Sequence, residues 1–313
     1  MRDVIPTRTV RLQPWFRAGG VEACFPTQRG GALILKDRGR TFLNESLSPV
    51  RLQNRPIDGS FWTTHAQRLP DGGYALASSR SKLGERNLQL FDDRGRYRTS
   101  FPVGDGIEHM AVDGKGRIWV GYFDEGIYGG DPLSSHGISC FDQSGNLEYQ
   151  WDYRTVGPID DCDALTLDEN GRAWVCPYSR YFVAMIADSD VRALLPSAPV
   201  SVISGLLTGT THLGLLGGTD FHGNGDRAVA IWHVAPEGIR TEFPPNEGPE
   251  ATDKESVVTI VNFQTGARTQ VQVLDDNASP LPFRNKVRCR AGTAVCWTKD
   301  SVYRFTLENL LAA

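Results

Sequence analysis

Short hydrophobic runs separated by polar turns fill this chain, and helical periodicity is almost absent. The clearest pattern is GIEHMAVDGKGRIWVGY at 106–122, in which two hydrophobic stretches flank a polar turn. It returns as DCDALTLDENGRAWVCPY at 161–178. Superposed on their Gly-Arg pairs, the two segments match Asp113 with Asp168, Trp119 with Trp174, and Glu108 with Asp163. A recurring unit of this size predicts a tandem array of β-hairpins.

Reading the same pattern along the whole chain predicts six units of four short strands each. The units span 20–57, 60–104, 106–154, 158–203, 206–275 and 283–308. The last unit has three strands, and the unpaired strand at 5–14 is expected to complete it. Closing a ring in this way hides sheet edges. The sequence therefore predicts a single all-β domain, a six-bladed β-propeller closed by its N-terminal strand. A pair of β-sandwiches and a seven-bladed ring that splits the fifth unit are the alternatives.

In a propeller the first strand of each blade lines the central channel, and superposing the units gives the residue at the mouth of each inner strand. These residues are Glu22, His65, Glu108, Asp163, His212 and Arg288. Three carboxylates brought together require compensating charge. A divalent cation held by Glu22, Glu108 and Asp163 is one source of that charge. Ca, Mg or Mn would suit these oxygen ligands, and Mn, Fe or Zn would be favoured if a histidine were a further ligand. Neutralisation by Arg288 and the histidines is another, and binding of an organic ligand is a third.

Loops on the same face are expected to form a polar cup above the ring. The candidate substrate-binding residues are Arg80, Asp124, Glu125, Tyr178, Arg180 and His233. Each is equally compatible with an ordinary solvated loop tip. Two long segments, 125–137 and 235–255, are either candidate lids over this face or flexible surface loops without a role in the site.

Composition narrows the classes of function. The chain has 313 residues, of which 40% are hydrophobic, and a net charge of -4. No basic run with interleaved aromatics points to nucleic acid, and no segment reaches the roughly 18 apolar residues of a membrane helix. The six cysteines form no CxxC pair, which disfavours zinc ribbons and disulfide frameworks. We expect a soluble, cytoplasmic protein with reduced, buried thiols, acting on a small molecule, with no nucleic-acid or membrane partner.

The segments IEHMAVDGKGRIWVGY and DALTLDENGRAWVCPY resemble the blade consensus of the gluconolactonase/regucalcin family. That family consists of six-bladed propellers that hydrolyse sugar lactones at a divalent metal in the channel mouth. The resemblance implies that Asp163 occupies the position of a metal-binding Asp, and Glu108 that of a substrate-side Asn. Glu22 is similar to the family's N-terminal metal Glu, whereas the third ligand, an Asn, has no counterpart.

These observations together favour a metal-dependent hydrolase of a small ester or lactone. The cation would activate water, with Asp163 or Glu108 as ligand or base. His65 or His212 would be the acid or base because imidazole titrates near neutrality. Arg288 would stabilise an oxyanion or a substrate carboxylate. The alternatives are a metal-free acid-base enzyme of the lyase or cyclase type, and a binding propeller without activity.

Overall fold

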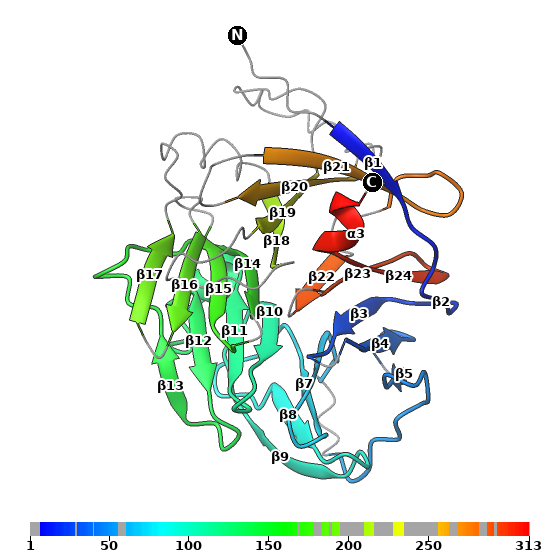
Figure 1. Ribbon diagram of the computed structural model, residues 1–313. Coiled ribbons are helices and arrows are strands. Elements are labelled where there is room, and N and C mark those ends of the chain that lie inside the picture. Colours follow the sequence, from blue (N-terminus) through cyan, green and yellow to red (C-terminus); the bar gives the residue numbers. More distant parts are fainter. Residues whose placement is uncertain are drawn as a thin grey trace, which may run out of the picture.

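The protein is an array of β-sheets placed around one centre, as the computed structural model in Figure 1 shows. The structure describes residues 7–28, 30–39, 41–55, 61–167, 170–177, 183–187, 190–194, 210–215, 228–234, 256–262, 268–281, 287–290 and 293–312. Within these residues the backbone hydrogen bonds define six sheets, each built mainly from strands that follow one another in the chain.

The strands are best described blade by blade. Blade one has β3 (Ala23–Pro26), β4 (Ala32–Lys36) and β5 (Thr41–Leu43). Blade two has β6 (His65–Arg68), β7 (Tyr74–Ala77), β8 (Leu88–Phe91) and β9 (Tyr97–Phe101). Blade three has β10 (Ile107–Val112), β11 (Ile118–Tyr122), β12 (Ile138–Phe141) and β13 (Leu147–Gln150). Blade four has β14 (Cys162–Leu167), β15 (Ala173–Pro177), β16 (Val183–Ala187) and β17 (Asp190–Leu194). Blade five has β18 (Thr210–Leu215), β19 (Ala228–Val234), β20 (Ser256–Asn262) and β21 (Arg268–Leu274), and blade six has β22 (Val287–Arg290), β23 (Thr293–Trp297) and β24 (Ser301–Thr306).

The first strands of the blades form a closed ring. Each of β3, β6, β10, β14 and β18 contacts the first strand of the following blade, and β22 of blade six returns to β3. This arrangement confirms the predicted six-bladed propeller. It places the start of every inner strand around one central channel, which is the feature on which a functional site depends.

The ring is closed by the N-terminal segment, as predicted, but by different residues. β2 (Phe16–Arg17) pairs antiparallel with β24 and completes blade six. The segment 5–14 was predicted to complete blade six. It contains β1 (Thr7–Arg11) instead, and β1 pairs in parallel with β21 at the outer edge of blade five. Pro14 lies between the two strands and has no N–H for a ladder, so the chain changes sheet there.

Blade one has three named strands, and its outer edge is finished by a short extended segment. The backbone N–H of Val50 donates to the carbonyl of Phe42 at 2.9 Å, and Pro49 forms an isolated bridge with Leu43. The proline at this edge limits the pairing to a few residues.

The repeated Asp-x-x-Gly-Arg-x-Trp motif is a turn that fixes its own hairpin. In blade three, Asp113 Oδ1 accepts the backbone N–H groups of Lys115 and Arg117, both at 2.9 Å. Asp113 Oδ2 accepts from Arg117 Nε at 2.6 Å and from Trp119 Nε1 at 3.3 Å. Gly116 has φ +83°, a left-handed conformation that favours glycine. The motif that carries the family resemblance is therefore structural.

The hydrophobic core lies between neighbouring blades. Trp119, Trp174 and Trp297 are at most 2% exposed and lie within the buried interior. Of the described cysteines, Cys24, Cys140, Cys162 and Cys296 are buried as thiols. The closing helix α3 (Leu307–Leu311) adds Leu310 to the cluster between blades five and six. No helix in the described part of the chain is long and apolar enough to span a bilayer.

The segment at 125–137 is packed against its blade. It begins within α1 (Asp124–Tyr128), and Ser134 is fully buried with its hydroxyl donating to the carbonyl of Gly126 at 2.7 Å. The turn holds Ile127 in the core cluster of blades two to four. The candidate lid at 125–137 is therefore packed against the rest of blade three. The second candidate lid, 235–255, lies outside the described residues.

Candidate functional site

A β-bulge occurs at the same place in three successive inner strands. The pairing register shifts between Ile107 and His109 in β10, and between Cys162 and Ala164 in β14. Glu108 and Asp163 are the two bulged residues, which supports the equivalence drawn from the sequence. Bulges re-aim side chains and are frequent beside active sites.

The third bulge changes one assignment. In β18 the register shifts between Thr210 and His212, so Thr211 is the residue equivalent to Glu108 and Asp163. The sequence superposition placed His212 there, and the structure corrects it by one residue. A bulge inserts an extra residue that hydrophobic alternation alone does not reveal.

Glu22 belongs to a turn of its own blade. Its Oε1 accepts the backbone N–H of Arg38 at 2.7 Å, and its Oε2 accepts that of Gly39 at 3.1 Å. Asp37, Arg38 and Gly39 all have positive φ, between 54° and 68°. Two aligned N–H groups make an anion-binding concavity, and the Glu22 carboxylate fills it. Both oxygens of this candidate metal ligand therefore stabilise a strained turn.

His65 lies at the channel mouth and is buried, with 6% of its surface exposed. Its Nε2 is 3.0 Å from the carbonyl oxygen of Glu108, and its Nδ1 is 2.9 Å from Thr64 Oγ1. A carbonyl only accepts, so Nε2 carries the proton and Nδ1 accepts from the hydroxyl. Burial lowers the pKa of His65 to about 4. This corrects the expectation that His65 titrates near neutrality.

Arg288 enters the same mouth from β22 of blade six. Burial lowers the pKa of its guanidinium, while the charge of Glu108 acts to raise it. Its Nη1 donates to the carbonyl of Val287 at 2.9 Å, and its guanidinium carbon lies 5.8 Å from the centre of the Trp297 ring. The structure thus brings His65, Glu108 and Arg288 into one electrostatic cluster.

A fourth member of this cluster, Asp161, was not predicted. It precedes β14 and is half-buried. Burial raises its pKa to about 6, and the neighbouring charges of Glu108 and Asp124 add to the increase. The sequence does contain a signal for Asp161, which is the acidic run Asp160-Asp161-Cys162-Asp163 at the start of an inner strand. The superposition of the repeats identified only Asp163 from this run.

Three of the predicted cup residues form the rim beside Asp161. Arg80 pairs with Asp105, Nε to Oδ1 at 3.1 Å, and with the Glu125 carboxylate on α1. Asp124, at the start of α1, is exposed and acts on Asp161. The rim therefore links the loops of blades two, three and four.

The remaining predicted residues have side chains outside the described part of the structure. Asp163 lies on β14, His212 on β18 and His233 on β19, each with only its strand position described. Tyr178 and Arg180 fall between the described ranges 170–177 and 183–187.

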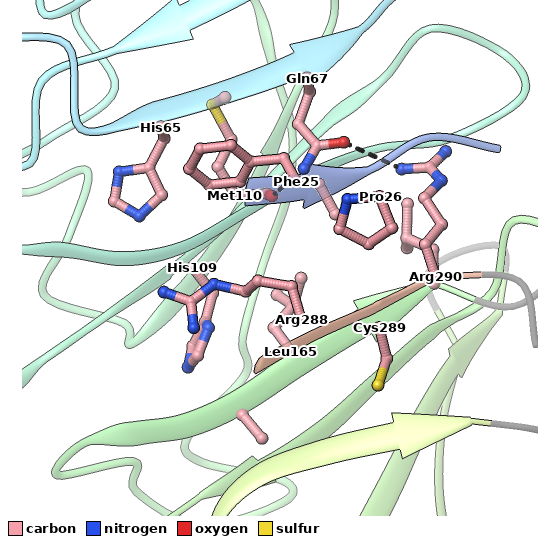
Figure 2. A pocket seen from close by; sticks show the side chains of 13 residues that line it. Phe25, Pro26, His65, Gln67, His109, Met110, Leu165, Arg288, Cys289 and Arg290 are labelled. Carbon is pink, nitrogen blue, oxygen red and sulfur yellow. Dashed lines mark hydrogen bonds between the residues drawn. The ribbon is translucent and has the colours of Figure 1, made fainter. Parts of the chain in front are cut away.

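Below the mouth, the channel contains a cavity that opens to solvent. Figure 2 shows that His65 and Gln67 from β6, His109 from β10, and Arg288 and Arg290 from β22 line it. Phe25, Met110 and Leu165 supply apolar surface. Among the described residues, the lining contains two arginines and two histidines but no carboxylate.

Of the three predicted metal ligands, Glu22 and Glu108 have described side chains, and each interacts with another group of the protein. Within the described residues, no three histidine, cysteine, aspartate or glutamate side chains are arranged to hold an ion. Glu22 is bound to the 37–39 turn, and the charge of Glu108 acts on the buried Arg288 cation. A guanidinium competes with a metal ion for the same carboxylate.

The chain is a six-bladed β-propeller, and solved structures of this fold resemble it along most of its length. Virginiamycin B lyase from Staphylococcus aureus gives a TM-score of 0.50 at 13% identity, over 93% of this chain and 98% of the lyase. The extracellular domain of a hybrid two-component system from B. thetaiotaomicron gives 0.52 at 8% identity, over 94% of this chain and 34% of that protein. A gluconolactonase from Xanthomonas campestris gives 0.49 at 11% identity, over 93% and 87% of the two chains.

At these identities the comparisons establish the fold alone. They confirm the expected β-propeller fold. No family model matches the sequence. No curated protein matches it either.

Proposed function

We propose that this propeller hydrolyses a small ester or lactone at the mouth of its channel by acid-base catalysis. The observation that carries the proposal is the convergence of four side chains from four blades: His65, Glu108, Asp161 and Arg288. Convergence of ionisable groups with opposed pKa shifts in a cleft is typical of catalytic sites.

Asp161 is the proposed general base. A carboxyl group with a pKa of about 6 is mostly ionised at pH 7 and is still basic enough to accept a proton from water. The water oxygen attacks the substrate carbonyl carbon while its proton moves to Asp161. When the C–O bond to the leaving oxygen breaks, the protonated Asp161 returns that proton to it. One water is consumed, and an acid and an alcohol result.

Arg288 is the proposed electrophile. Its buried guanidinium provides fixed positive charge for the oxyanion that forms during attack, and such charge is most effective where water is excluded. Glu108 orients Arg288 by charge attraction. His65, neutral and hydrogen-bonded on both sides, positions the strand that carries Glu108.

A metal-dependent version of the same reaction is the second candidate. Crowding of Asp161 with Glu108 and Asp124 favours it, because a cation would relieve the repulsion that raises the pKa of Asp161. Glu108 and Asp163 would hold Ca, Mg, Mn or Zn, which would supply an activated water. Elemental analysis of the purified protein, followed by activity after chelation, separates the two versions.

A panel of aryl esters and γ- and δ-lactones tests the proposal. We expect turnover by the wild type, and a loss of about 10² to 10³ in kcat for Arg288→Gln, the usual effect of removing one oxyanion donor. The mass of the products separates hydrolysis, which adds one water, from elimination of the kind that the name of the lyase neighbour implies. Binding of panel members without any turnover would instead support a non-enzymatic propeller.

A further inference from the structure

Arg290 is a buried charged side chain in the lining of the channel cavity. It is 6% exposed and lies two residues after Arg288 on β22. Residues i and i+2 of a strand share a face, so both arginines point toward the cavity that they line. Figure 2 shows that the two guanidinium groups extend to different sides of the cavity, with that of Arg290 directed toward Gln67.

The groups that Arg290 contacts are neutral. Its Nη1 lies 3.4 Å from Gln67 Oε1, the contact marked in Figure 2, and its Nη2 donates to the carbonyl oxygen of Val112. Gln67 in turn donates from Nε2 to the carbonyl of Met110 at 3.1 Å, which fixes the orientation of its amide. Neither acceptor neutralises the guanidinium.

Asp113 is the acid whose charge acts on Arg290, but its carboxylate is committed elsewhere. It accepts from Arg117, from two backbone N–H groups and from the Trp119 indole. Within the described residues, Arg290 forms no ion pair with a carboxylate. A buried cation without a direct counter-charge is costly, and burial lowers the pKa of Arg290 to about 10.

The surroundings of Arg290 suit a small organic anion. The Arg290 guanidinium offers the planar pair of donors that matches a carboxylate. Met110, Leu165 and Leu167 line the same cavity and favour a short apolar body on the ligand. Apolar walls also strengthen the charge interaction by lowering the local dielectric.

We propose that the channel cavity binds a small carboxylate at Arg290, and that the substrate of the mouth carries such a carboxylate. The second half of this inference rests on the proposed function. The carboxylate pairs with Arg290, the apolar body lies beside Met110 and Leu165, and the ester or lactone carbonyl reaches Arg288 and Asp161 above. The substrate class is therefore an ester or lactone of a carboxylic acid that retains one free carboxylate.

The test measures binding of propionate to the purified full chain at pH 7 by calorimetry or ligand-observed NMR. Propionamide, which has the same shape without the charge, and inorganic phosphate are titrated in parallel. We expect propionate to bind at least about tenfold more tightly than propionamide, and Arg290→Gln to remove this difference. Preference for phosphate over propionate would overturn the carboxylate assignment.

Matched variants keep the outcome interpretable. Arg94→Gln removes the same charge from an exposed turn and should leave propionate binding unchanged. Arg290→Lys retains the charge without the planar donor pair and should bind more weakly than wild type but more tightly than Arg290→Gln. Melting curves establish that each variant is folded, and equal binding of propionate by folded Arg290→Gln and wild type would overturn the proposal.

Asp161→Asn separates this inference from the proposed function. It should lose hydrolysis and still bind propionate as wild type does, because Asp161 lies at the mouth and outside the cavity lining. Propionate binding without any turnover in the wild type would refute the proposed hydrolase alone. Turnover of neutral esters together with no charge preference in binding would refute the carboxylate site alone.

Discussion

The Nε2 atom of His65 lies 3.0 Å from the backbone carbonyl oxygen of Glu108. This hydrogen bond joins the inner strand of blade two to the bulge of blade three. Because Nε2 must donate, the ring is held in one neutral tautomer by Thr64 on its other side. His65 therefore serves the architecture of the channel mouth, and its protonation opposes folding.

Acid should expose this role of His65. Its pKa is about 4 in the folded protein and near 6.5 when unfolded, so the unfolded chain binds more protons between these values. The stabilisation from neutral His65 is complete above pH 6.5 and is lost as the pH falls toward 4. When the pH is lowered from 7 to 4.5, we expect the free energy of unfolding of the wild type to fall by about 2 kcal/mol more than that of His65→Gln. Urea denaturation at the two pH values measures this, and an equal loss in both proteins would contradict it.

Asp161 should show the opposite pH dependence. Its folded pKa of about 6 exceeds the usual 3.9, so ionising it in the folded protein costs stability as the pH rises from 4 to 6. Asp161→Asn should raise the free energy of unfolding at pH 7 by about 1 kcal/mol, after allowance for partial solvent screening. The gain should vanish near pH 4. A variant less stable than wild type at pH 7 would show that the carboxylate is satisfied in the native protein.

Glu22 should behave as a structural residue. Its carboxylate holds the N–H groups of Arg38 and Gly39 in a turn with positive φ. Glu22→Ala is expected to lower the free energy of unfolding by about 1 kcal/mol and to leave bound metal and kcat/KM unchanged. Thermal melting, elemental analysis and kinetics of the same preparation check this, and loss of a bound ion would return Glu22 to the role of a ligand.

Gly121 marks the close approach of blades three and four. A Cβ at this position would lie 2.6 Å from Cys162 Sγ, well inside contact distance. We expect Gly121→Ala to cost about 1 to 3 kcal/mol of unfolding free energy through overpacking. Gly114→Ala, where the nearest atom is 3.6 Å away, is the matched control and should cost less than about 1 kcal/mol. Similar unfolding free energies for the two variants would contradict the tight packing.

The fold could be predicted from the sequence because its turns are local. Asp113 and Gly116 specify one hairpin through contacts within five residues, and the repeat multiplies that signal. The closing strand was assigned to the wrong part of the N-terminal segment because strand propensity gave no indication that the chain changes sheet at Pro14.

The site was less predictable because it depends on contacts between blades. Asp161 acquires part of its raised pKa from Asp124 on α1, and sequence spacing does not reveal that neighbour. Thr211, and not His212, corresponds to Glu108 and Asp163 because it is the bulged residue of β18. Arg290 could have been found, since the alternation in Val-Arg-Cys-Arg places it on the same face as Arg288.

The most direct test of the account is the pH dependence of kcat/KM on the ester and lactone panel, measured for wild type and for Asp161→Asn. In the wild type, kcat/KM should rise with an inflection near pH 6 as Asp161 ionises. In Asp161→Asn the inflection should be absent and most of the activity lost. An unchanged inflection in folded Asp161→Asn would contradict the proposed catalytic role of the channel mouth.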